Sequence, residues 1–308
     1  MPKDQEKTRS MKIGKVELSL TNQDKLYFPK DGITKGDVID YYNAMHKYIL
    51  PYLKDRPQSL MRTPNGILEK GFYHKDMRGA VPSWAKTIKV PSDSHGSPIE
   101  YLICNDKATL LYMNNLGCIE INPWNSRTQN LLNPDYFVID LDPADKNTFE
   151  QVIETAQVVH EILEKAKAPS FCKTSGATGL HIYVPLGAKY NYDQASQFAN
   201  IIAVLANEIL PKFTSVVRSV EKRGQKIYID YLQNKRGQTL SSVYSLRPRP
   251  GATASTPLLW KEVKKGLHPT DFTIKTLPKR VAKVGDLFKG VLGKGVDIEK
   301  CLDNLAKG

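Results

Sequence analysis

The sequence predicts an α+β protein with mainly antiparallel sheets flanked by helices. Short segments with alternating apolar residues, typical of strands, occur along the chain of 308 residues, and several are joined by tight turns. Two longer segments, 149–166 and 192–210, carry apolar residues at helical spacing. No internal repeat or linker rich in Pro, Gly or Ser divides the chain, so we expect a single bilobed domain.

The N-terminal part is predicted to begin with a flexible leader at 1–12, and the domain should run from 13 to 308. Apolar residues alternate at 16–20, which is typical of a strand, and a turn-rich, lysine-bearing segment follows at 22–35. Thr34 and Asp37 form an approximate capping box for the next helix. The end region of that helix is marked by Pro51, and its apolar positions are Val38, Tyr41, Tyr42, Met45 and Ile49.

The remaining elements alternate between short strands and helices. Proline and glycine break the strands between 59 and 90, and the tail from Pro278 onward is predicted to be helical. Between them we expect a helix near 107–115, a strand at 118–121, a strand at 136–140, a helix at 149–166, a strand at 169–173, a turn at 175–179, a strand at 180–184, a helix at 192–210, and strands at 214–217 and 226–232.

Composition and charge favour a globular protein with a polyanionic partner. Apolar residues make up 41% of the chain, enough for a substantial core, and the formal net charge is +12 with a pI near 9.3. Because Lys and Arg neutralise phosphates, nucleic acid is the leading candidate partner. The four cysteines form no Cys-x-x-Cys pair, which argues against a zinc ribbon. We expect no signal peptide, no membrane partner and a cytoplasmic location.

Three aspartates lie inside predicted buried strands. Asp140 and Asp142 are two residues apart, so they share one strand face, while the other face is apolar and should pack against the helix at 149–166. Asp230 lies in a second strand. A buried unpaired carboxylate costs several kcal/mol, so this cluster predicts divalent cations and chemistry on phosphates. The alternative is a chance Asp-x-Asp pair that caps a turn or helix, a role also open to Asp145.

A turn rich in glycine and hydroxyl residues is the second candidate site. Gly176 and Gly179 permit positive φ and close approach of a ligand, and backbone amides in such turns bind phosphate oxygens. Ser175 and Thr178 add hydroxyl donors, and His181 faces away from the apolar side of its strand. The alternative is an ordinary hairpin turn followed by a surface histidine. The segment matches neither a Walker loop nor the dinucleotide-binding fingerprint.

Two arginines next to prolines form the third candidate. Arg247 and Arg249 are separated by Pro248 and are stiffened by it. Rigid guanidinium groups suit a triphosphate. A solvated basic loop is the alternative.

Taken together, six motifs resemble the polymerase domain of ligase D, the prokaryotic end-joining branch of the archaeo-eukaryotic primase superfamily. The motifs occur in the same order between about residue 15 and residue 290; they are 22–29, 62–66, 137–143, 174–185, 228–234 and 244–247. The resemblance implies a primase-like catalytic core at about 98–260, behind an N-terminal part that contacts DNA ends. Two positions depart from the family: Asn122 replaces a common histidine, and Thr178 replaces a residue that is usually basic.

The resemblance also implies a role for individual residues. The ligands of two catalytic cations, Mn²⁺ or Mg²⁺, would be Asp140, Asp142 and Asp230. The incoming nucleotide would be bound by Ser175, Gly176, Thr178, Gly179, His181, Arg223 and Arg247. The DNA end and its 5′-phosphate would be bound by Lys25, Lys35, Arg62 and Phe72.

The expected function is a template-directed nucleotidyltransferase that fills gaps and extends 3′ ends at double-strand breaks. By the same resemblance it would prefer ribonucleotides, work at the nucleoid, and act with a Ku-like end-binder and a separate DNA ligase. Two rival hypotheses remain open. A two-metal nuclease also needs clustered carboxylates, whereas a non-catalytic DNA-end-binding scaffold has no reason to bear their electrostatic cost.

Overall fold

A six-stranded sheet forms the centre of the C-terminal lobe in the computed structural model, which describes residues 8–92 and 96–307. Neighbouring strands are antiparallel except for one parallel pair at the edge, β15 with β16. The strands lie in the order β15 (Thr214–Ser215), β16 (Ile227–Asp230), β12 (Tyr136–Asp142), β14 (Leu180–Pro185), β13 (Phe171–Thr174) and β17 (Pro257–Leu258).

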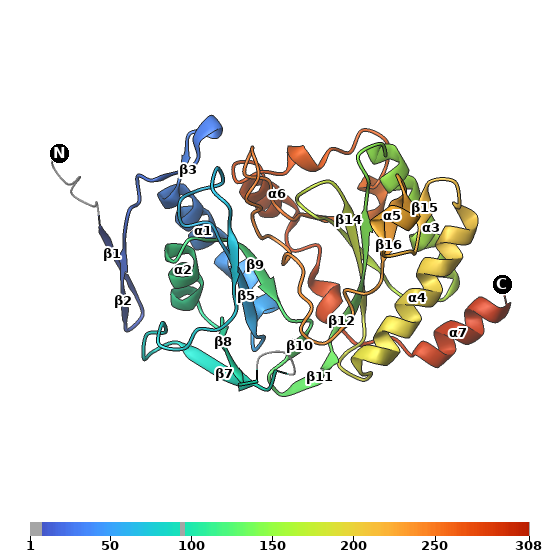
Figure 1. Ribbon diagram of the computed structural model, residues 1–308, viewed down its shortest axis with the longest axis horizontal. Coiled ribbons are helices and arrows are strands. Elements are labelled where there is room, and N and C mark those ends of the chain that lie inside the picture. Colours follow the sequence, from blue (N-terminus) through green and yellow to red (C-terminus); the bar gives the residue numbers. More distant parts are fainter. Residues whose placement is uncertain (1–7, 93–95, 308) are drawn as a thin grey trace.

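Two long helices cover one face of this sheet: α3 (Phe149–Lys165) and α4 (Tyr192–Ile209) (Figure 1). Capping boxes fix where both begin. Thr148 exchanges hydrogen bonds with Gln151 at the start of α3, and Asn191 does so with Gln194 at the start of α4. Thr148 is therefore the cap before α3, and the helix-capping role considered for Asp145 is wrong.

The N-terminal lobe is built around the helix α1 (Lys35–Leu53), whose capping box joins Thr34 and Asp37 as predicted. The helix continues two residues past Pro51 before it ends. Around it lie α2 (Lys107–Asn115), the sheet β6 (Phe72–His74), β5 (Gln58–Arg62) and β9 (Cys118–Pro123), and the hairpins β1 (Arg9–Ile13) with β2 (Val16–Leu20), β3 (Leu26–Phe28) with β4 (Ile33–Thr34), and β7 (Lys86–Val90) with β8 (Ile99–Ile103).

Smaller elements connect and close the two lobes. The hairpin β10 (Ser126–Arg127) with β11 (Asn130–Pro134) leads into β12. The remaining helices are α5 (Val220–Arg223), α6 (Leu277–Val284) and α7 (Ile298–Lys307), with 3₁₀ turns η1 (Pro29–Asp31), η2 (Trp260–Glu262), η3 (Pro269–Asp271) and η4 (Lys289–Leu292). The predicted helical tail is thus interrupted between 285 and 297.

One boundary prediction is wrong. The leader predicted at 1–12 extends too far, because residues 9–13 form β1 and pair with β2 along their whole length. The alternation of Met11 and Ile13 gives this short strand an apolar side, and both pack against the core of the N-terminal lobe. Residues 1–7 lie outside the described part of the chain.

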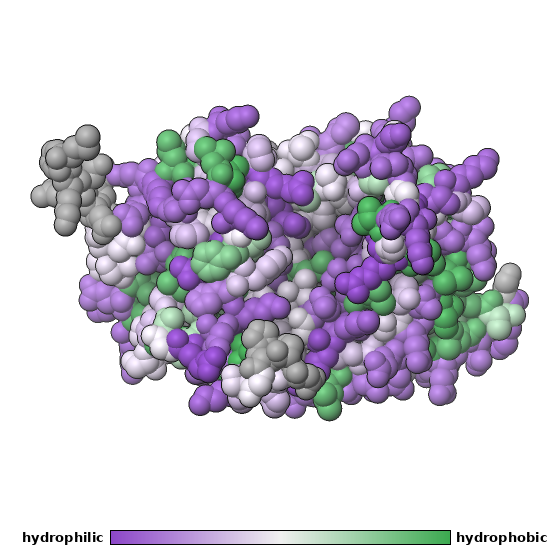
Figure 2. Space-filling model, viewed as in Figure 1, coloured by the Kyte–Doolittle hydropathy of each residue, from purple (hydrophilic) through white to green (hydrophobic). Residues whose placement is uncertain are grey.

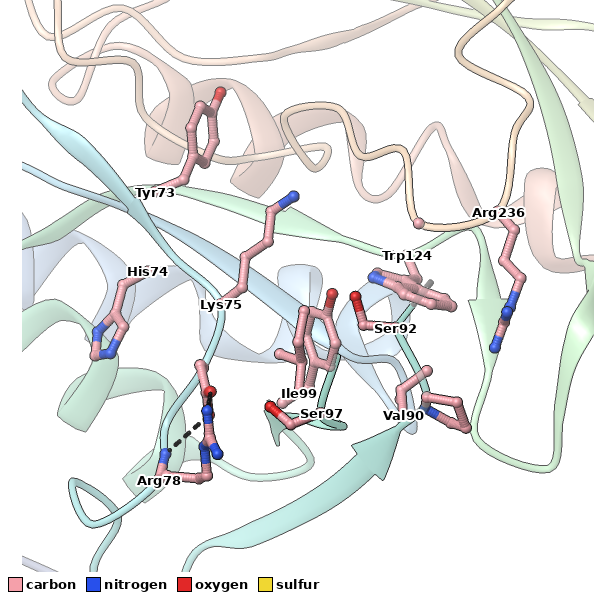
Figure 3. A pocket seen from close by; sticks show the side chains of 14 residues that line it. Tyr73, His74, Lys75, Arg78, Val90, Ser92, Ser97, Ile99, Trp124 and Arg236 are labelled. Carbon is pink, nitrogen blue, oxygen red and sulfur yellow. Dashed lines mark hydrogen bonds and ion pairs between the residues drawn. The ribbon is translucent and has the colours of Figure 1, made fainter. Parts of the chain in front are cut away.

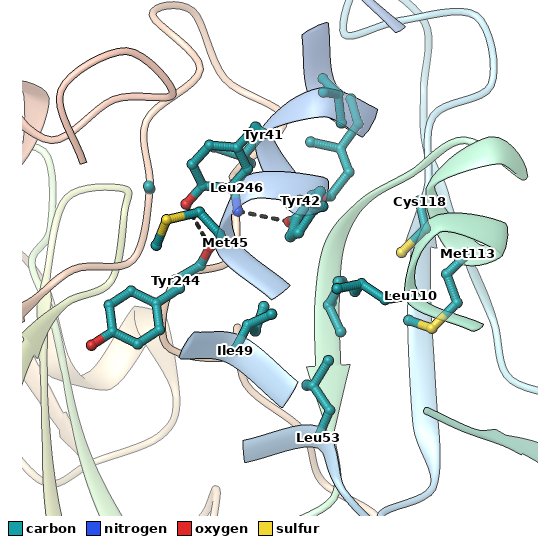
Figure 4. Close-up of a cluster of buried hydrophobic side chains, with 14 of the residues drawn as sticks. Tyr41, Tyr42, Met45, Ile49, Leu53, Leu110, Met113, Cys118, Tyr244 and Leu246 are labelled. Carbon is teal, nitrogen blue, oxygen red and sulfur yellow. Dashed lines mark hydrogen bonds between the residues drawn. The ribbon is translucent and has the colours of Figure 1, made fainter. Parts of the chain in front are cut away.

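The hydrophobic core has two main parts on opposite faces of the large sheet. Phe137, Ile139 and Leu141 pack with apolar residues of α3 and α4, as the alternation of β12 predicts. The second part fills the N-terminal lobe, where α1, α2 and β9 pack around Tyr42 and Met45 (Figure 4). Val138, on the same face of β12 as Asp140, belongs to this second part. The aspartate face of the sheet therefore faces the N-terminal lobe.

None of the helices within 8–92 and 96–307 is both long enough and apolar enough to cross a membrane.

Candidate active site between the two lobes

Four polar residues lie side by side across the large sheet. In the strand register Asp140 on β12 is opposite Asp230 on β16 and opposite His181 on β14, and His181 is opposite Lys173 on β13. Directly paired residues in neighbouring strands project to the same face. All four side chains are at least nine-tenths buried, so this row places two carboxylates and two basic groups beneath the N-terminal lobe.

The three predicted aspartates differ in their surroundings. Asp230 is held by two hydrogen bonds, from the Leu232 amide at 2.7 Å and the Gln233 side chain at 2.9 Å. Oδ1 of Asp140 lies 3.2 Å from Nε2 of His181, but the contact is too poorly aligned for a hydrogen bond, and within residues 8–92 and 96–307 this buried oxygen has no hydrogen-bond partner. Asp142 ends β12 and is exposed. The site thus contains a buried carboxylate oxygen that is available to a ligand.

Burial and mutual repulsion raise the pKa of these carboxyl groups. Loss of hydration raises the pKa of Asp140 to about 6, while the positive charges of Lys173 and Arg247 oppose the shift. The pKa of Asp142 rises to about 7 because of desolvation on its inner side and repulsion from Asp140 and Asp230. The pKa of Asp230 is also raised, first by burial. Like charges so placed favour a bound cation.

The carboxylate groups of Asp140, Asp142 and Asp230 are the type of ligand that a divalent cation prefers, although they are not gathered around one point. Within the described residues no group of three or more His, Cys, Asp or Glu side chains is arranged as a metal site. Oxygen donors suit Mg²⁺ and Mn²⁺, and the unpartnered Oδ1 of Asp140 is such a donor. Carboxylates that repel one another need a cation to bring them together.

The predicted phosphate-binding turn connects β13 to β14 at the edge of the same cleft. Gly176 has φ of 73°, and a Cβ there would lie 2.7 Å from Cγ of Arg247. Gly179 is required for a different reason, because a Cβ would collide with the carbonyl of Leu141. Ser175 Oγ accepts hydrogen bonds from the amides of Ala177 and Gly179, at 3.0 and 3.1 Å. Its own proton is therefore free to be donated outward.

Arg247 joins this turn to the N-terminal lobe. Its Nη1 donates to the carbonyl of Ser175 at 2.7 Å, and its Nε lies 2.8 Å from a carboxylate oxygen of Glu120 on β9. Glu120 and Asn122, two residues apart on β9, share the strand face that lines the cleft. The guanidinium is therefore fixed in orientation from both lobes.

The other predicted nucleotide-binding arginine lies on the opposite side of the carboxylates. Arg223 ends the short helix α5, and its guanidinium lies over the ring of Tyr228, 4.6 Å from the ring centre. Tyr228 is opposite Asp142 in the register, and the charge of Arg223 lowers the pKa of Asp142. Arg223 and Arg247 thus flank Asp142 from two directions.

These groups surround a small cavity of about 180 Å³. Figure 2 shows the hollow between the lobes on a face that is otherwise mostly hydrophilic. Of the predicted residues the cavity brings together Asp140, Asp142, Ser175, Thr178, His181, Arg247 and Arg249. Asp230 is paired with Asp140 in the register but, like Arg223, does not line the cavity.

A larger groove of about 840 Å³ adjoins this cavity, and Tyr73 lines both. Lys75 and Arg236 stand on opposite sides of the groove with Trp124 between them (Figure 3). The guanidinium of Arg236 lies 6.0 Å from the centre of the indole ring. Cations and aromatic rings together suit a nucleic-acid strand, whose phosphates and bases they contact.

The predicted DNA-end residues lie in the N-terminal lobe, outside the cavity. Arg62 and Phe72 are paired on β5 and β6, with the guanidinium 5.3 Å from the ring centre, and Phe72 is 47% exposed. Lys25 is exposed and donates to Asn65. Lys35 is buried, and its ammonium donates to the carbonyl of Thr21 at 2.8 Å. Lys35 therefore supports the turn that carries Lys25.

The structure adds residues that the sequence analysis did not select. Lys173 is fully buried beside His181, and Glu120 orients Arg247. The strand pattern contained a signal for Lys173, since a lysine inside an apolar strand is as unusual as an aspartate. Glu120 carried the same signal, since it lies between Ile119 and Ile121 in the predicted strand 118–121, but its partner Arg247 is 127 positions away along the chain and could not be identified.

Comparison with known proteins matches this arrangement to one family. The family described as "LigD, primase-polymerase domain" matches residues 34–288. The chain is 32% identical over 274 residues to the bifunctional non-homologous end joining protein LigD of Bacillus subtilis, covering 88% of this chain and 44% of that protein. It is 30% identical over 246 residues to the multifunctional LigD protein of Mycolicibacterium smegmatis, covering 79% of this chain and 32% of the relative. The chain thus spans less than half the length of these two relatives.

A solved structure agrees with the sequence matches. The polymerase domain from Mycobacterium tuberculosis ligase D, in complex with DNA, superposes with a TM-score of 0.82 at 27% identity. The match covers 91% of this chain and 99% of that domain. The primase-like α+β fold predicted from the motifs is confirmed.

Proposed function

Because this chain belongs to the LigD primase-polymerase family, we propose that it is a template-directed nucleotidyltransferase that fills gaps and extends 3′ ends at DNA double-strand breaks. One observation carries the proposal. Three aspartates lie on two paired strands, and two of them, Asp140 and Asp142, line a cavity together with a turn and an arginine that suit a triphosphate. A reaction that joins a 3′-hydroxyl to a nucleoside triphosphate needs both parts together.

Asp140, Asp142 and Asp230 hold two divalent cations, Mn²⁺ or Mg²⁺, in this proposal. Such a pair of cations would lower the pKa of the primer 3′-hydroxyl and neutralise charge on the departing pyrophosphate. Support comes from the raised pKa of the carboxyl groups and from the unpartnered Oδ1 of Asp140. No side chain acts as a covalent nucleophile, so the protein contributes positioning and electrostatic stabilisation.

The triphosphate binds between the turn and the arginines. Arg247, oriented by Glu120 and the Ser175 carbonyl, directs its remaining N–H groups to phosphate oxygens, and the Ser175 hydroxyl donates alongside. Arg223 neutralises charge on the far side of Asp142. Preference for ribonucleotides over deoxyribonucleotides follows from the likeness to the family and is part of the proposal.

DNA binds along the N-terminal lobe and the groove beside Tyr73. Lys25 holds the downstream 5′-phosphate, supported by Lys35, and Phe72 with Arg62 stacks against the end of the duplex. The net charge of +12 suits such a substrate. A Ku-like end-binder, a separate DNA ligase and location at the nucleoid in the cytoplasm complete the proposal.

A primer-extension assay tests the function. A labelled primer is placed before a short gap, and extension is followed with ATP or dATP and with Mn²⁺ or Mg²⁺. Template-dependent extension that is faster with ATP supports the proposal. Shortening of the strand in the absence of nucleotide supports the two-metal nuclease instead, and binding without either reaction supports the scaffold.

Substitution of Asp230 tests the catalytic assignment in the same assay. Asp230→Ala should reduce extension at least about a hundredfold, because a metal ligand is lost. Asp303→Ala, which removes an exposed carboxylate on α7, is the matched control and should leave the rate unchanged. Extension by Asp230→Ala at the rate of the unsubstituted protein would show that the metal assignment is wrong.

Removal of the downstream 5′-phosphate tests the DNA-end residues. The unsubstituted protein should bind the gap more weakly without this phosphate, whereas Lys25→Ala should bind both substrates equally weakly. Because Lys25→Ala loses one phosphate contact, its plot of log affinity against log salt concentration should be shallower, with a slope reduced by about 1. If the 5′-phosphate has no effect on binding by the unsubstituted protein, Lys25 does not hold it.

A further inference from the structure

Lys173 is buried at a position where its charged form is costly, because an ammonium there loses its hydration. It lies in the middle of β13, has no exposed surface, and is opposite His181 in the register. Burial is the main reason that the pKa of Lys173 falls to about 7, and Arg247 lowers it further. A buried ammonium is retained only where its protons have partners, so its contacts indicate what it does.

Three polar atoms surround Nζ of Lys173. Nζ lies 3.0 Å from the carbonyl of Ser241, 2.6 Å from Oγ of Ser255 and 2.9 Å from Nδ1 of His181. The carbonyl only accepts. Ser255 donates its own proton to the carbonyl of Thr174 at 2.8 Å, so its oxygen must accept from Lys173. An ammonium has three protons and no lone pair, which matches three acceptors.

The contact with Lys173 determines which nitrogen of His181 carries the proton. If Nδ1 accepts from the ammonium, the proton of the neutral imidazole must be on Nε2. Nε2 lies 3.2 Å from Oδ1 of Asp140. The reverse arrangement, with Nδ1 donating to a neutral amine, would turn the lone pair of Nε2 toward that carboxylate. The ring of Tyr183, 5.5 Å from Nζ, also favours a cation there.

We propose that Lys173 is a positioning residue that holds His181 in the form protonated on Nε2. His181 then directs its Nε2 proton into the cleft, where an oxygen of the incoming triphosphate or a realigned Asp140 can accept it. It has no lone pair left on the cleft side and so is not a metal ligand. The consequence for catalysis rests on the proposed function, whereas the placement of the proton does not.

The proton placement is measured directly in the unsubstituted protein. Long-range ¹H–¹⁵N correlation spectra of histidine-labelled protein at about pH 6, below the pKa of Lys173, distinguish the two ring forms, with His181→Gln used to assign the signals. A protonated Nε2 together with a hydrogen-bonded, unprotonated Nδ1 is expected for His181. A proton on Nδ1 would overturn the proposal, whether or not the protein extends primers.

A substitution then tests Lys173 itself. Lys173→Met keeps the length of the side chain but removes the donor, so the Nδ1 signal of His181 should shift. Lys173 lies outside the proposed metal ligands and acts through His181 beside Asp140, so its loss should cost about 10- to 100-fold in activity, the range for outer-shell partners of metal sites. The value of kcat should fall with the KM for nucleotide changed less than about threefold. An unshifted Nδ1 signal, or an unchanged kcat, contradicts the role.

The control is another lysine that donates to a backbone carbonyl. Lys189→Met removes a contact with the carbonyl of Gly295, far along the chain from the cleft residues. It should leave both the His181 signals and kcat unchanged. If the unsubstituted protein shows the expected ring form but extends no primer, the proposed function fails and the proton placement stands.

Discussion

At the scale of single residues, burial and neighbouring charges shift the pKa values of both acidic and basic groups of the site. Asp140 is buried between Asp230 and His181, and its pKa is raised to about 6. Lys173 balances part of this negative charge, and its own pKa is lowered. Such mutual shifts are typical of functional sites, because structural ion pairs instead stabilise the charged form of both partners.

Mn²⁺ should bind more tightly as the pH rises from about 5 to about 8, because protons compete with metal for carboxylates. The window follows from the pKa of Asp140, about 6, and the pKa of Asp142, about 7, both above the usual 3.8. Titration calorimetry at several pH values measures the effect. Asp142→Asn should show weaker binding with a smaller pH dependence. An affinity that does not change across this range would contradict the prediction.

The stability of the metal-free protein should depend on pH in the opposite direction to its metal affinity. A carboxyl group with a raised pKa keeps its proton in the folded state at pH values where the unfolded chain has lost it. The contribution of Asp140 and Asp142 to the free energy of unfolding therefore falls as the pH rises from about 4 to about 7. Urea unfolding of the protein and of Asp142→Asn measures the difference between their pH profiles. Parallel profiles would show that Asp142 has no raised pKa.

At the scale of elements, the turn between β13 and β14 depends on contacts with β12 and with the 247–255 segment. Gly176 allows Arg247 and Ser255 to approach the backbone, and Gly179 packs against the carbonyl of Leu141. Thr253 donates to the carbonyl of Gly176 as well. Both glycines are needed for tertiary packing, and only Gly176 also needs a positive φ.

Gly179→Ala should destabilise the protein by about 1–3 kcal/mol, the usual cost of forcing extra atoms into a packed site. The added Cβ has to displace the end of β12, where Asp142 lies, so nucleotide binding should weaken too. Urea unfolding and nucleotide titration measure the two effects. Thr178→Ala changes the exposed neighbour and is the stability control, since it removes atoms from solvent and adds no clash. Equal stability of the two variants would contradict the predicted clash.

At the scale of the whole molecule, polar contacts tie the two lobes across the cleft. Glu120 on the N-terminal lobe pairs with Arg247, and the hydroxyl of Tyr41 donates to the carbonyl of Tyr244 at 2.8 Å. Tyr52 on α1 and Tyr244 both donate to the carboxylate of Asp286, at 2.8 and 2.6 Å. The segment after α6 is thereby attached to the helix at the centre of the N-terminal lobe.

Asp286→Asn should lower the free energy of unfolding by about 1.5–3 kcal/mol, the range for hydrogen bonds to a charged group. The amide replaces one accepting oxygen with a donor, so one tyrosine hydroxyl loses its partner. Urea unfolding measures the loss. Asp297→Asn is the control, because its carboxylate forms an exposed pair with Lys300 at 3.6 Å and accepts from the exposed Lys300 amide at 3.2 Å, a bond that an amide oxygen can also accept. Asp286 does not line the cleft, so primer extension by folded Asp286→Asn should be unchanged. Reduced extension would show that the contacts of Asp286 with Tyr52 and Tyr244 also shape the cleft.

The sequence alone determined the order of the elements and the chemical character of the site. Alternation along β12 distinguishes its apolar face from its aspartate face, and capping residues locate the start of α1. These features depend on neighbours a few positions apart, so a linear pattern contains them. The turn at 175–179 is likewise visible as a run of small residues. The proposed catalytic roles came from the resemblance of ordered motifs, and the family match confirms the resemblance itself.

Only the tertiary structure decided which distant residues meet. The pairing of Asp140 with Asp230 and His181, the contact of Lys173 with His181 and the bridge from Glu120 to Arg247 all join positions on different strands or lobes. Strand order and register set these contacts, and neither follows from local propensity. Burial is also a property of the folded chain. It shifts the pKa of Lys173 and Asp140, and so makes a row of ordinary residues into a candidate catalytic centre.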